Sequence, residues 1–343
     1  MSLRWKRKKQ LVYDTYRLSS SSSLTSLNYK TTSAYSDLLQ RAVSDDNVGT
    51  LNGLICSGAD INAADQFGDT PLSLAIKRGQ YEMASYLIAN GSRVEHLPAD
   101  SVVSSLVESG KISLIKSLLE AGYDVDSKDG LGNTLLHYAL EKGNFPELIT
   151  TILDLSKPNV NAKNLKGRTP FSLALFYPDS SPHNTIERML RMNAKPFDPI
   201  QIQLGSSSRR VSSLYAACSV GKGRGVQKLL EYGLHPDGYF SGKKSRNSSF
   251  DLNQNFCQEF RPVCIAIYNS DLSSLKLLLK YNAETQFGIG HAFCVSSSKI
   301  CHSDALTLSI RLRRYDEAKL LLQTGSRLNW EELDRRQILL HYP

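Results

Sequence analysis

The amino-acid sequence predicts an all-α solenoid of about eight helix-turn-helix units, joined by hairpin fingers and carrying long loop insertions in the later units. Three observations predict this fold class: a short motif recurs along the chain, two marker residues in most units lie 16 residues apart, and the second half of each unit carries an apolar stripe. One such unit cannot bury its own apolar face, so neighbouring units must stack.

The recurring motif contains a threonine that can cap a helix, the first residues of that helix and an alanine within it. The letters DTPLSLA occupy residues 69–75, NTLLHYA occupies 133–139 and RTPFSLA occupies 168–174. Thr70 can cap a helix N-terminus, and Pro71 fits the first turn, where the backbone N–H has no helical partner. The motif therefore predicts that a helix begins in each copy.

The second observation is the distance between a small or apolar residue in the first helix and a Gly-like residue that ends the second. Six pairs lie 16 residues apart: Ala42/Gly58, Ala75/Gly91, Leu106/Gly122, Ala217/Gly233, Ala266/Asn282 and Ser309/Gly325. Two further units, anchored at Ala139 and Ala174, carry small insertions. Glycine suits the left-handed residue that stops a helix, and leucine-rich runs such as Leu118-Leu119 supply the apolar stripe of each second helix.

Gly58–Ala63, with the letters GADINA, follows the second helix of the first unit. Together with the Thr-Pro-Leu helix starts, this segment resembles the ankyrin repeat. The resemblance covers about residues 36–329. It implies repeats near 36–64, 65–96, 97–128, 129–163, 164–195, 209–237, 260–284 and 303–329, with insertions at 196–208, 238–259 and 285–302. The third repeat lacks the Thr-Pro start, so we expect it to be the softest part of the first half.

Two segments flank the predicted array. Residues 1–35 begin basic and continue rich in serine and threonine, a composition that buries too little apolar surface to offset chain entropy, so we expect a disordered tail. Residues 330–343 follow Asn329, a suitable helix cap. They predict a C-terminal capping helix over the last apolar face.

Composition narrows the class of protein. Of the 343 residues 41% are hydrophobic and 22% charged, as in ordinary globular proteins. No apolar run approaches the roughly 18 residues of a membrane-spanning helix, and no apolar core follows the basic N-terminus as in a secretory signal. Six cysteines are too few for a disulfide framework, which favours a reducing compartment, cytoplasmic or nuclear.

The net charge of +8 is concentrated in two regions. Residues 1–30 hold seven Lys or Arg residues and one acid, and residues 195–250 hold nine and three. Such segments attract phosphate, anionic lipid or acidic protein surfaces. Solvated, flexible chain explains them equally well.

Signatures of catalysis and of cofactor binding are weak, and we expect neither. The glycine-rich stretch at 221–225 lacks the spacing of a phosphate-binding loop and falls at the turn inside the sixth repeat. One set of residues in the 285–302 region suits zinc by type: His291, Cys294, Cys301 and His302. Because six residues separate the two cysteines and Cys301 adjoins His302, packed thiols are the preferred interpretation.

Four residues are candidates for modification. Ser19 and Ser248 follow arginine closely in segments predicted to be flexible, where phosphate would cancel positive charge. Asn62 and Asn161 occupy a place where some members of the resembled family are hydroxylated, although a structural role in the hairpin explains them fully. Ser212 has a basic-directed kinase pattern, but the register makes it a helix cap.

The resemblance implies binding of other proteins without catalysis, through the hairpin fingers and the concave face of the inner helices. Candidate finger residues are Phe67, Leu131 and Leu165, placed at equivalent tips. The 238–259 insertion adds Tyr239, Phe240, Lys243, Lys244 and Arg246, which suit an acidic or phosphorylated partner. A scaffold or adaptor is the leading hypothesis.

Two other classes stay open at this stage. The basic segments 1–30 and 195–250 suit association with nucleic acid or an anionic membrane. A ubiquitin-ligase substrate receptor is the third class. The short segment after the eighth repeat counts against it, because the resembled receptors carry a C-terminal box.

Overall fold

The structure is a computed structural model. It describes residues 25–95, 97, 106–142, 146–176, 185–204, 207–221, 223–238, 261–287, 292–295, 298–301 and 304–327, and within these ranges the side chains of all but 25–34, 142, 203–209 and 292–301. The chain divides into two compact units, Met1–Ser105 and Leu106–Pro343. The boundary between them falls inside the third predicted repeat.

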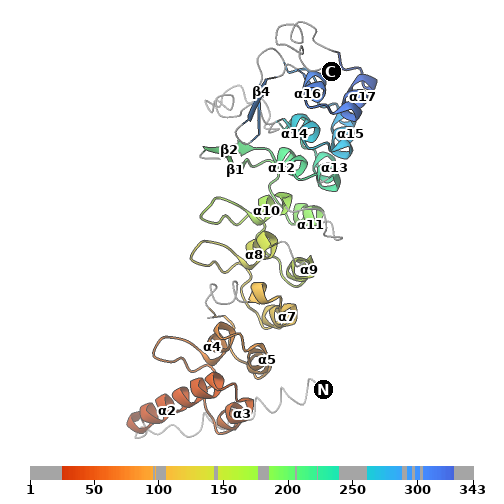
Figure 1. Cartoon of the computed structure of the whole chain (residues 1–343). Coiled ribbons are helices and arrows are strands. Elements are labelled where there is room, and N and C mark those ends of the chain that lie inside the picture. Colours follow the sequence, from red (N-terminus) through yellow and green to blue (C-terminus); the bar gives the residue numbers. More distant parts are fainter. Residues whose placement is uncertain are drawn as a thin grey trace, which may run out of the picture. The chain divides into compact units, whose positions relative to one another are not determined.

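The N-terminal compact unit contains two helix pairs (Figure 1). Its helices are α2 (Thr25–Ser44), α3 (Val48–Cys56), α4 (Pro71–Lys77) and α5 (Tyr81–Ala89). Helix α2 packs against both α3 and α4, and α4 packs against α5. The first helices of two successive repeats therefore lie side by side, as expected for stacked units.

Helix α2 begins at Thr25, so the prediction of a disordered tail over 1–35 is wrong for its last eleven residues. The buried residues Leu39, Ala42 and Val43 fix the C-terminal part of this helix. Adding a residue to an existing helix costs far less than starting one, because the nucleus is already formed. The serine-rich composition hid this extension, since serine and threonine are only modestly poor helix formers.

The C-terminal compact unit is built from two rows of helices (Figure 1). The row of first helices contains α8 (Leu135–Lys142), α10 (Pro170–Phe176), α12 (Ser213–Ser219), α14 (Pro262–Tyr268) and α16 (Ala305–Arg311). The row of second helices contains α7 (Ile112–Glu120), α9 (Pro146–Leu155), α11 (Thr185–Arg191), α13 (Gly223–Glu231), α15 (Leu272–Lys280) and α17 (Tyr315–Gln323). Each helix contacts the next one in its row.

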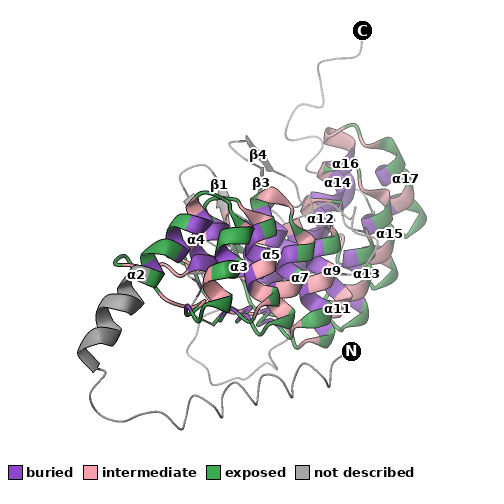
Figure 2. Cartoon of the chain, turned by 90° about the horizontal axis from the view of Figure 1, so that it is seen from below, coloured by how far each residue is buried: buried purple, intermediate pink, exposed green. Residues whose placement is uncertain are grey.

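The eight predicted anchor residues are buried in full. They are Ala42, Ala75, Leu106, Ala139, Ala174, Ala217, Ala266 and Ser309. Helices carry buried residues on one side and exposed residues on the other (Figure 2). The small anchors let first helices of neighbouring repeats approach closely, so the register read from the sequence is confirmed.

The predicted helix caps are also confirmed. The Thr70 hydroxyl accepts a hydrogen bond from Ser73 N at 3.2 Å, with Pro71 as the first helical residue. Ser212 accepts one from Tyr215 N at 3.1 Å and is buried. The residues that end second helices have positive φ, as predicted: Gly58, Gly91, Gly122, Asn193, Gly233, Asn282 and Gly325.

The apolar stripe is narrower than the leucine runs indicate. In α7 the buried residues are Leu114, Ile115 and Leu118, whereas Leu119 is half-buried. Adjacent residues on a helix point about 100° apart, so a Leu-Leu pair cannot place both side chains at the centre of the interface.

Two insertions form β-hairpins inside the otherwise helical fold. Strands β1 (Ile200–Leu204) and β2 (Ser207–Val211) pair antiparallel, with Ile200 opposite Val211. Strands β3 (Ala292–Val295) and β4 (Ser298–Cys301) pair likewise, with Ala292 opposite Cys301. Since β2 reaches Val211, the first insertion continues past the predicted limit of 208. Ser212 then caps α12 directly.

Candidate protein-interaction surface

We call the segments 65–69, 129–133 and 164–168 fingers. Each precedes a first helix, and each is a tight turn held by a side chain at its first residue. In the first finger Asp65 Oδ1 accepts hydrogen bonds from Phe67 N at 2.8 Å and Asp69 N at 2.9 Å. Asp65 N also donates to Asp69 O at 2.9 Å. These bonds fix the backbone of the tip.

The second finger repeats this geometry. Asp129 Oδ1 accepts from Leu131 N at 2.9 Å and from Asn133 N at 2.6 Å. Its other carboxylate oxygen accepts from the Tyr138 hydroxyl at 2.8 Å, which ties the finger to α8. Phe67 and Leu131 therefore occupy the same place, two residues after the aspartate.

The third finger places its apolar residue one position earlier. Asn164 takes the role of the aspartate, because its Oδ1 accepts from Arg168 N at 2.9 Å. Leu165 directly follows Asn164, so it matches Gln66 of the first finger, and Lys166 matches Phe67. The predicted equivalence of Leu165 with the other two tips is therefore wrong by one residue. The Asx residue, not the apolar one, sets the register.

Phe67, Leu131 and Leu165 are nevertheless exposed, by 80%, 56% and 77%. Leu165 N donates to Leu131 O at 3.0 Å, so the second and third fingers are joined by a backbone hydrogen bond. Gly132 permits this approach: its φ is positive, and a Cβ there would lie 3.2 Å from Asn164 Cα. In the C-terminal compact unit these fingers and the β1–β2 hairpin extend to the same side (Figure 1).

The two candidate hydroxylation sites connect neighbouring repeats. Asn62 Oδ1 accepts a hydrogen bond from Arg93 N at 2.7 Å. Asn161 Oδ1 accepts from Lys195 N at 3.0 Å, and its Nδ2 donates to Asn193 O at 2.9 Å. This bracing explains both asparagines by structure alone, and their modification stays a prediction.

His137 is buried and performs a structural role. Its Nδ1 accepts from Thr134 N at 3.1 Å, and its Nε2 lies 3.1 Å from Arg168 O. The proton therefore sits on Nε2 and links α8 to the third finger. Burial lowers the pKa of His137, so the neutral ring is favoured inside the fold.

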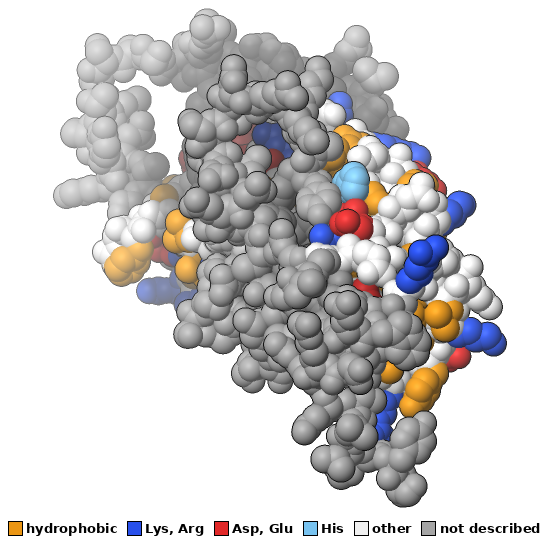
Figure 3. All heavy atoms as spheres, turned by 90° about the horizontal axis from the view of Figure 1, so that it is seen from above, with side chains coloured by type: hydrophobic (Ala, Val, Ile, Leu, Met, Phe, Trp, Pro, Cys, Tyr) orange, Lys and Arg blue, Asp and Glu red, His pale blue; other side chains and the backbone are white. Residues whose placement is uncertain are grey.

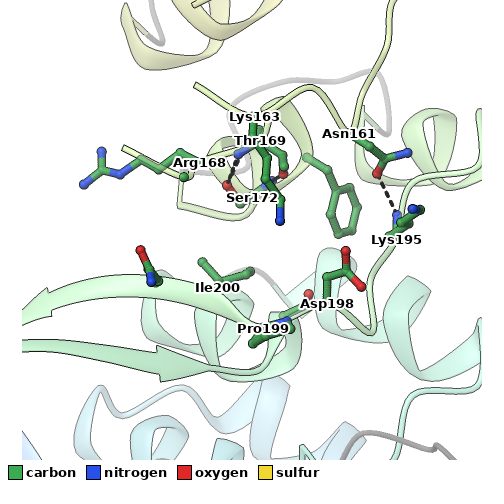
Figure 4. A pocket seen from close by; sticks show the side chains of 13 residues that line it. Asn161, Lys163, Arg168, Thr169, Ser172, Lys195, Asp198, Pro199 and Ile200 are labelled. Atoms are coloured by element: carbon green, nitrogen blue, oxygen red, sulfur yellow. Dashed lines mark hydrogen bonds between the residues drawn. The ribbon is translucent and has the colours of Figure 1, made fainter. Parts of the chain in front are cut away.

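A pocket of about 360 Å³ lies between the third finger and the β1–β2 hairpin. Lys163, Arg168, Lys195 and Asp198 bring charge to its lining. Figure 4 shows the Lys163 side chain extending into the pocket toward β1, the Asp198 carboxylate facing it from the other wall, and the Arg168 guanidinium pointing away. The sequence singled out Asn161 of this lining for another reason but did not indicate a pocket, because Lys195 and Asp198 lie some 30 residues from the finger.

Two of the described cysteine thiols are buried and are therefore weak nucleophiles. Cys218 and Cys264 are buried in first helices, and burial raises the pKa of each thiol far above its usual value. The glycines at 221–225 span the turn into α13, which begins at Gly223, as predicted. The described residues contain no group of three or more His, Cys, Asp or Glu side chains that could hold a metal ion.

Several candidates from the sequence lie outside the described residues or side chains. They are Ser19, Tyr239, Phe240, Lys243, Lys244, Arg246, Ser248, His291, His302, the side chains of Cys294 and Cys301, and the capping segment 330–343. Across the described ranges, no helix is both long enough and apolar enough to cross a membrane.

Stacked helix pairs with exposed, backbone-fixed fingers define a helical repeat protein of the protein-interaction class. The family model "Ankyrin repeats (many copies)" matches residues 39–88 and 103–153. An ankyrin repeat protein of fowlpox virus (strain NVSL) is 32% identical over 126 residues, covering 37% of this chain and 81% of the viral protein. The chain belongs to the ankyrin repeat family.

Other relatives share only part of their length with this chain. An ankyrin repeat-containing protein of Treponema pallidum (strain Nichols) is 36% identical over 101 residues, which cover 29% of this chain and 34% of that protein. The nuclear factor NF-kappa-B p105 subunit of Gallus gallus is 27% identical over 146 residues, covering 41% and 15%. The shared part is the ankyrin repeat, a general protein-interaction module.

Proposed function

We propose that this chain is a non-enzymatic scaffold or adaptor that binds partner proteins through its fingers and the inner helices beside them. The observation that carries the proposal is the pair of neighbouring tips, Leu131 and Leu165, which expose apolar side chains on a backbone fixed by hydrogen bonds. Phe67 presents the same feature on the N-terminal compact unit.

Fixed apolar tips suit binding for two reasons. A partner that covers them removes apolar surface from water, which contributes roughly 25 cal/mol per Å² buried. Because the finger backbone is already ordered, binding loses little further conformational entropy. Large exposed side chains on ordered backbone are therefore candidate hot spots.

Among the described residues, part of the positive charge is paired with carboxylates. In the basic region 195–250, Lys228 lies 3.5 Å from Glu187 and 3.1 Å from Glu231, so its charge is partly neutralised. In Figure 3 the described Lys and Arg side chains stand singly among polar and apolar ones. Binding to nucleic acid or an anionic membrane would rely on clustered cations.

Affinity capture with full-length protein tests the proposal. We compare wild type with the tip variant Phe67→Ser/Leu131→Ser/Leu165→Ser and with a control that changes exposed polar residues away from the fingers, Ser273→Ala/Thr324→Ala. Partners identified by mass spectrometry should be lost by the tip variant alone and should survive about 200 mM salt. Equal recovery on all three proteins, or loss of every partner between about 50 and 200 mM salt, contradicts the proposal.

A further inference from the structure

We infer that the pocket between the third finger and the β1–β2 hairpin binds an anionic side chain, a carboxylate or a phosphate, of a peptide segment that lies across the fingers. This inference rests on the proposed function, because the segment belongs to a partner held at the tips. It adds the chemistry of that partner: an acidic or phosphorylated residue beside an apolar one.

The charges in the pocket lining favour an anionic ligand over a cationic one. Two lysines, Lys163 and Lys195, and one carboxylate, Asp198, line the pocket, while the Arg168 guanidinium points away from it (Figure 4), so the charge of the lining is net positive. Among the described residues, no acidic group lies within ion-pair distance of Lys163 or Lys195. Residues 155–170, which form the finger and its approach, contain four Lys or Arg residues and no acid. Within the described part of the chain, an incoming anion therefore does not have to displace a carboxylate that is ion-paired with either lysine.

Four other polar residues of the lining are already hydrogen-bonded. Thr169 Oγ1 accepts from Ser172 N, and Ser172 Oγ accepts from Thr169 N, at 3.0 and 2.9 Å. The Ser213 hydroxyl donates to Pro196 O at 2.7 Å, and both ends of the Asn161 amide are bonded. The two ammonium groups carry three donors each and are suited to contact an anionic ligand.

The lining also contains apolar residues behind the charges. Phe171 and Ile200 are buried at the pocket, so the lysines stand at an interface between water and a less polar interior. Charge-assisted hydrogen bonds are stronger in such surroundings than in open water. Asn161 holds Lys195 N at 3.0 Å, so the backbone that carries one of the two cations is fixed to the neighbouring repeat.

The pocket and the tips belong to one finger. Lys163 and Gly167 line the pocket, and Leu165 between them points into solvent at the tip. A single extended segment can therefore place an apolar side chain on Leu165 and Leu131 and an acidic one in the pocket that Lys163 and Lys195 line. Asp198 opposes the anion and limits its affinity.

Fluorescence anisotropy with three synthetic peptides tests the inference on the full chain. The fluorescein-labelled peptides share one sequence of glycine and leucine and differ only at a central residue: phosphoserine, glutamate or serine. The pocket variant is Lys163→Gln/Lys195→Gln. The matched control, Lys276→Gln/Lys319→Gln, removes the same charge from exposed positions on α15 and α17. The third protein is Asp198→Asn.

Wild type should bind the phosphoserine or the glutamate peptide more tightly than the serine peptide, and the peptide that binds best identifies the source of the anion. The pocket variant should lose about fivefold or more in affinity, and the control should keep it. Asp198→Asn should gain about two- to fivefold.

Equal binding of all three peptides, or an equal loss in the control, would mean non-specific charge attraction and overturn the inference. Absence of anionic peptide binding to wild type also overturns it. That result leaves the proposed function standing if capture still depends on the tips. If the tip variant captures every partner, the proposed function fails instead, whatever the peptides show.

Discussion

Leu118 in α7 is 1% exposed, and Phe67 in the first finger is 80% exposed, yet both are large apolar residues at recurring positions of the repeat. The helix pair is fixed by burying such side chains, whereas the finger is fixed by hydrogen bonds from an Asx side chain to the backbone. Substitutions can therefore change stability and binding separately.

The largest effect should come from the helix core. Leu118→Ala should lower the free energy of unfolding by about 2–5 kcal/mol, because it leaves a cavity in the stack. Leu119→Ala should cost clearly less, since Leu119 is half-buried. Urea denaturation of both variants gives the two values. Equal losses would show that the difference in burial between Leu118 and Leu119 does not affect the free energy of unfolding.

Removing a finger's organising side chain should have an intermediate effect. Asp129→Ala deletes the acceptor for Leu131 N, Asn133 N and the Tyr138 hydroxyl, and should cost about 1–2 kcal/mol. The exposed Asp316→Ala on α17 is the control and should stay within about 0.5 kcal/mol of wild type. Denaturation midpoints that match for the two variants would contradict the role of Asp129.

The pH dependence of stability should depend on His137. Burial holds the pKa of His137 below its ordinary value, so the unfolded chain takes up a proton before the folded chain does. The free energy of unfolding should therefore fall as pH decreases through about 6.5, the ordinary histidine value. His137→Gln should remove that component from denaturation curves recorded at several pH values. If the variant retained the full wild-type slope of unfolding free energy against pH, this pH dependence would arise from other groups.

The smallest change in stability should come from the tips. Phe67→Ser should alter the free energy of unfolding by less than about 0.5 kcal/mol, since an exposed side chain loses little when shortened. The same substitution should weaken binding of a partner that covers this tip. A loss of several kcal/mol in thermal or urea unfolding would place Phe67 in the core and remove the distinction drawn here.

The helical register followed from the sequence because buried anchors must be small and helix stops must tolerate positive φ. Ala75 and Gly91 satisfy these demands by residue type, so their spacing was readable. The extension of α2 to Thr25 was not readable, because helix propagation depends on the buried part downstream rather than on local composition.

The tips were found from the sequence, but their register was not. Leu165 lies one residue earlier in its finger than Phe67 does in the first finger. Asn164 sets the turn through the hydrogen bond that it accepts from Arg168 N, and matching apolar residues between the fingers could not show this. The pocket was missed for a different reason. Lys163 comes from the fourth repeat and Asp198 from the insertion after the fifth, and only the folded structure brings them to one cavity.

The backbone hydrogen bond from Leu165 N to Leu131 O has a consequence for selectivity. Since it joins main chain to main chain, the distance between these two fingers does not depend on the side chains at positions 131 and 165, provided that Gly132 is kept. The tip residues can therefore be exchanged in evolution while the distance between the two fingers stays constant. A partner must therefore first present contact groups at that distance, and only then does the chemistry of those groups determine how well it binds.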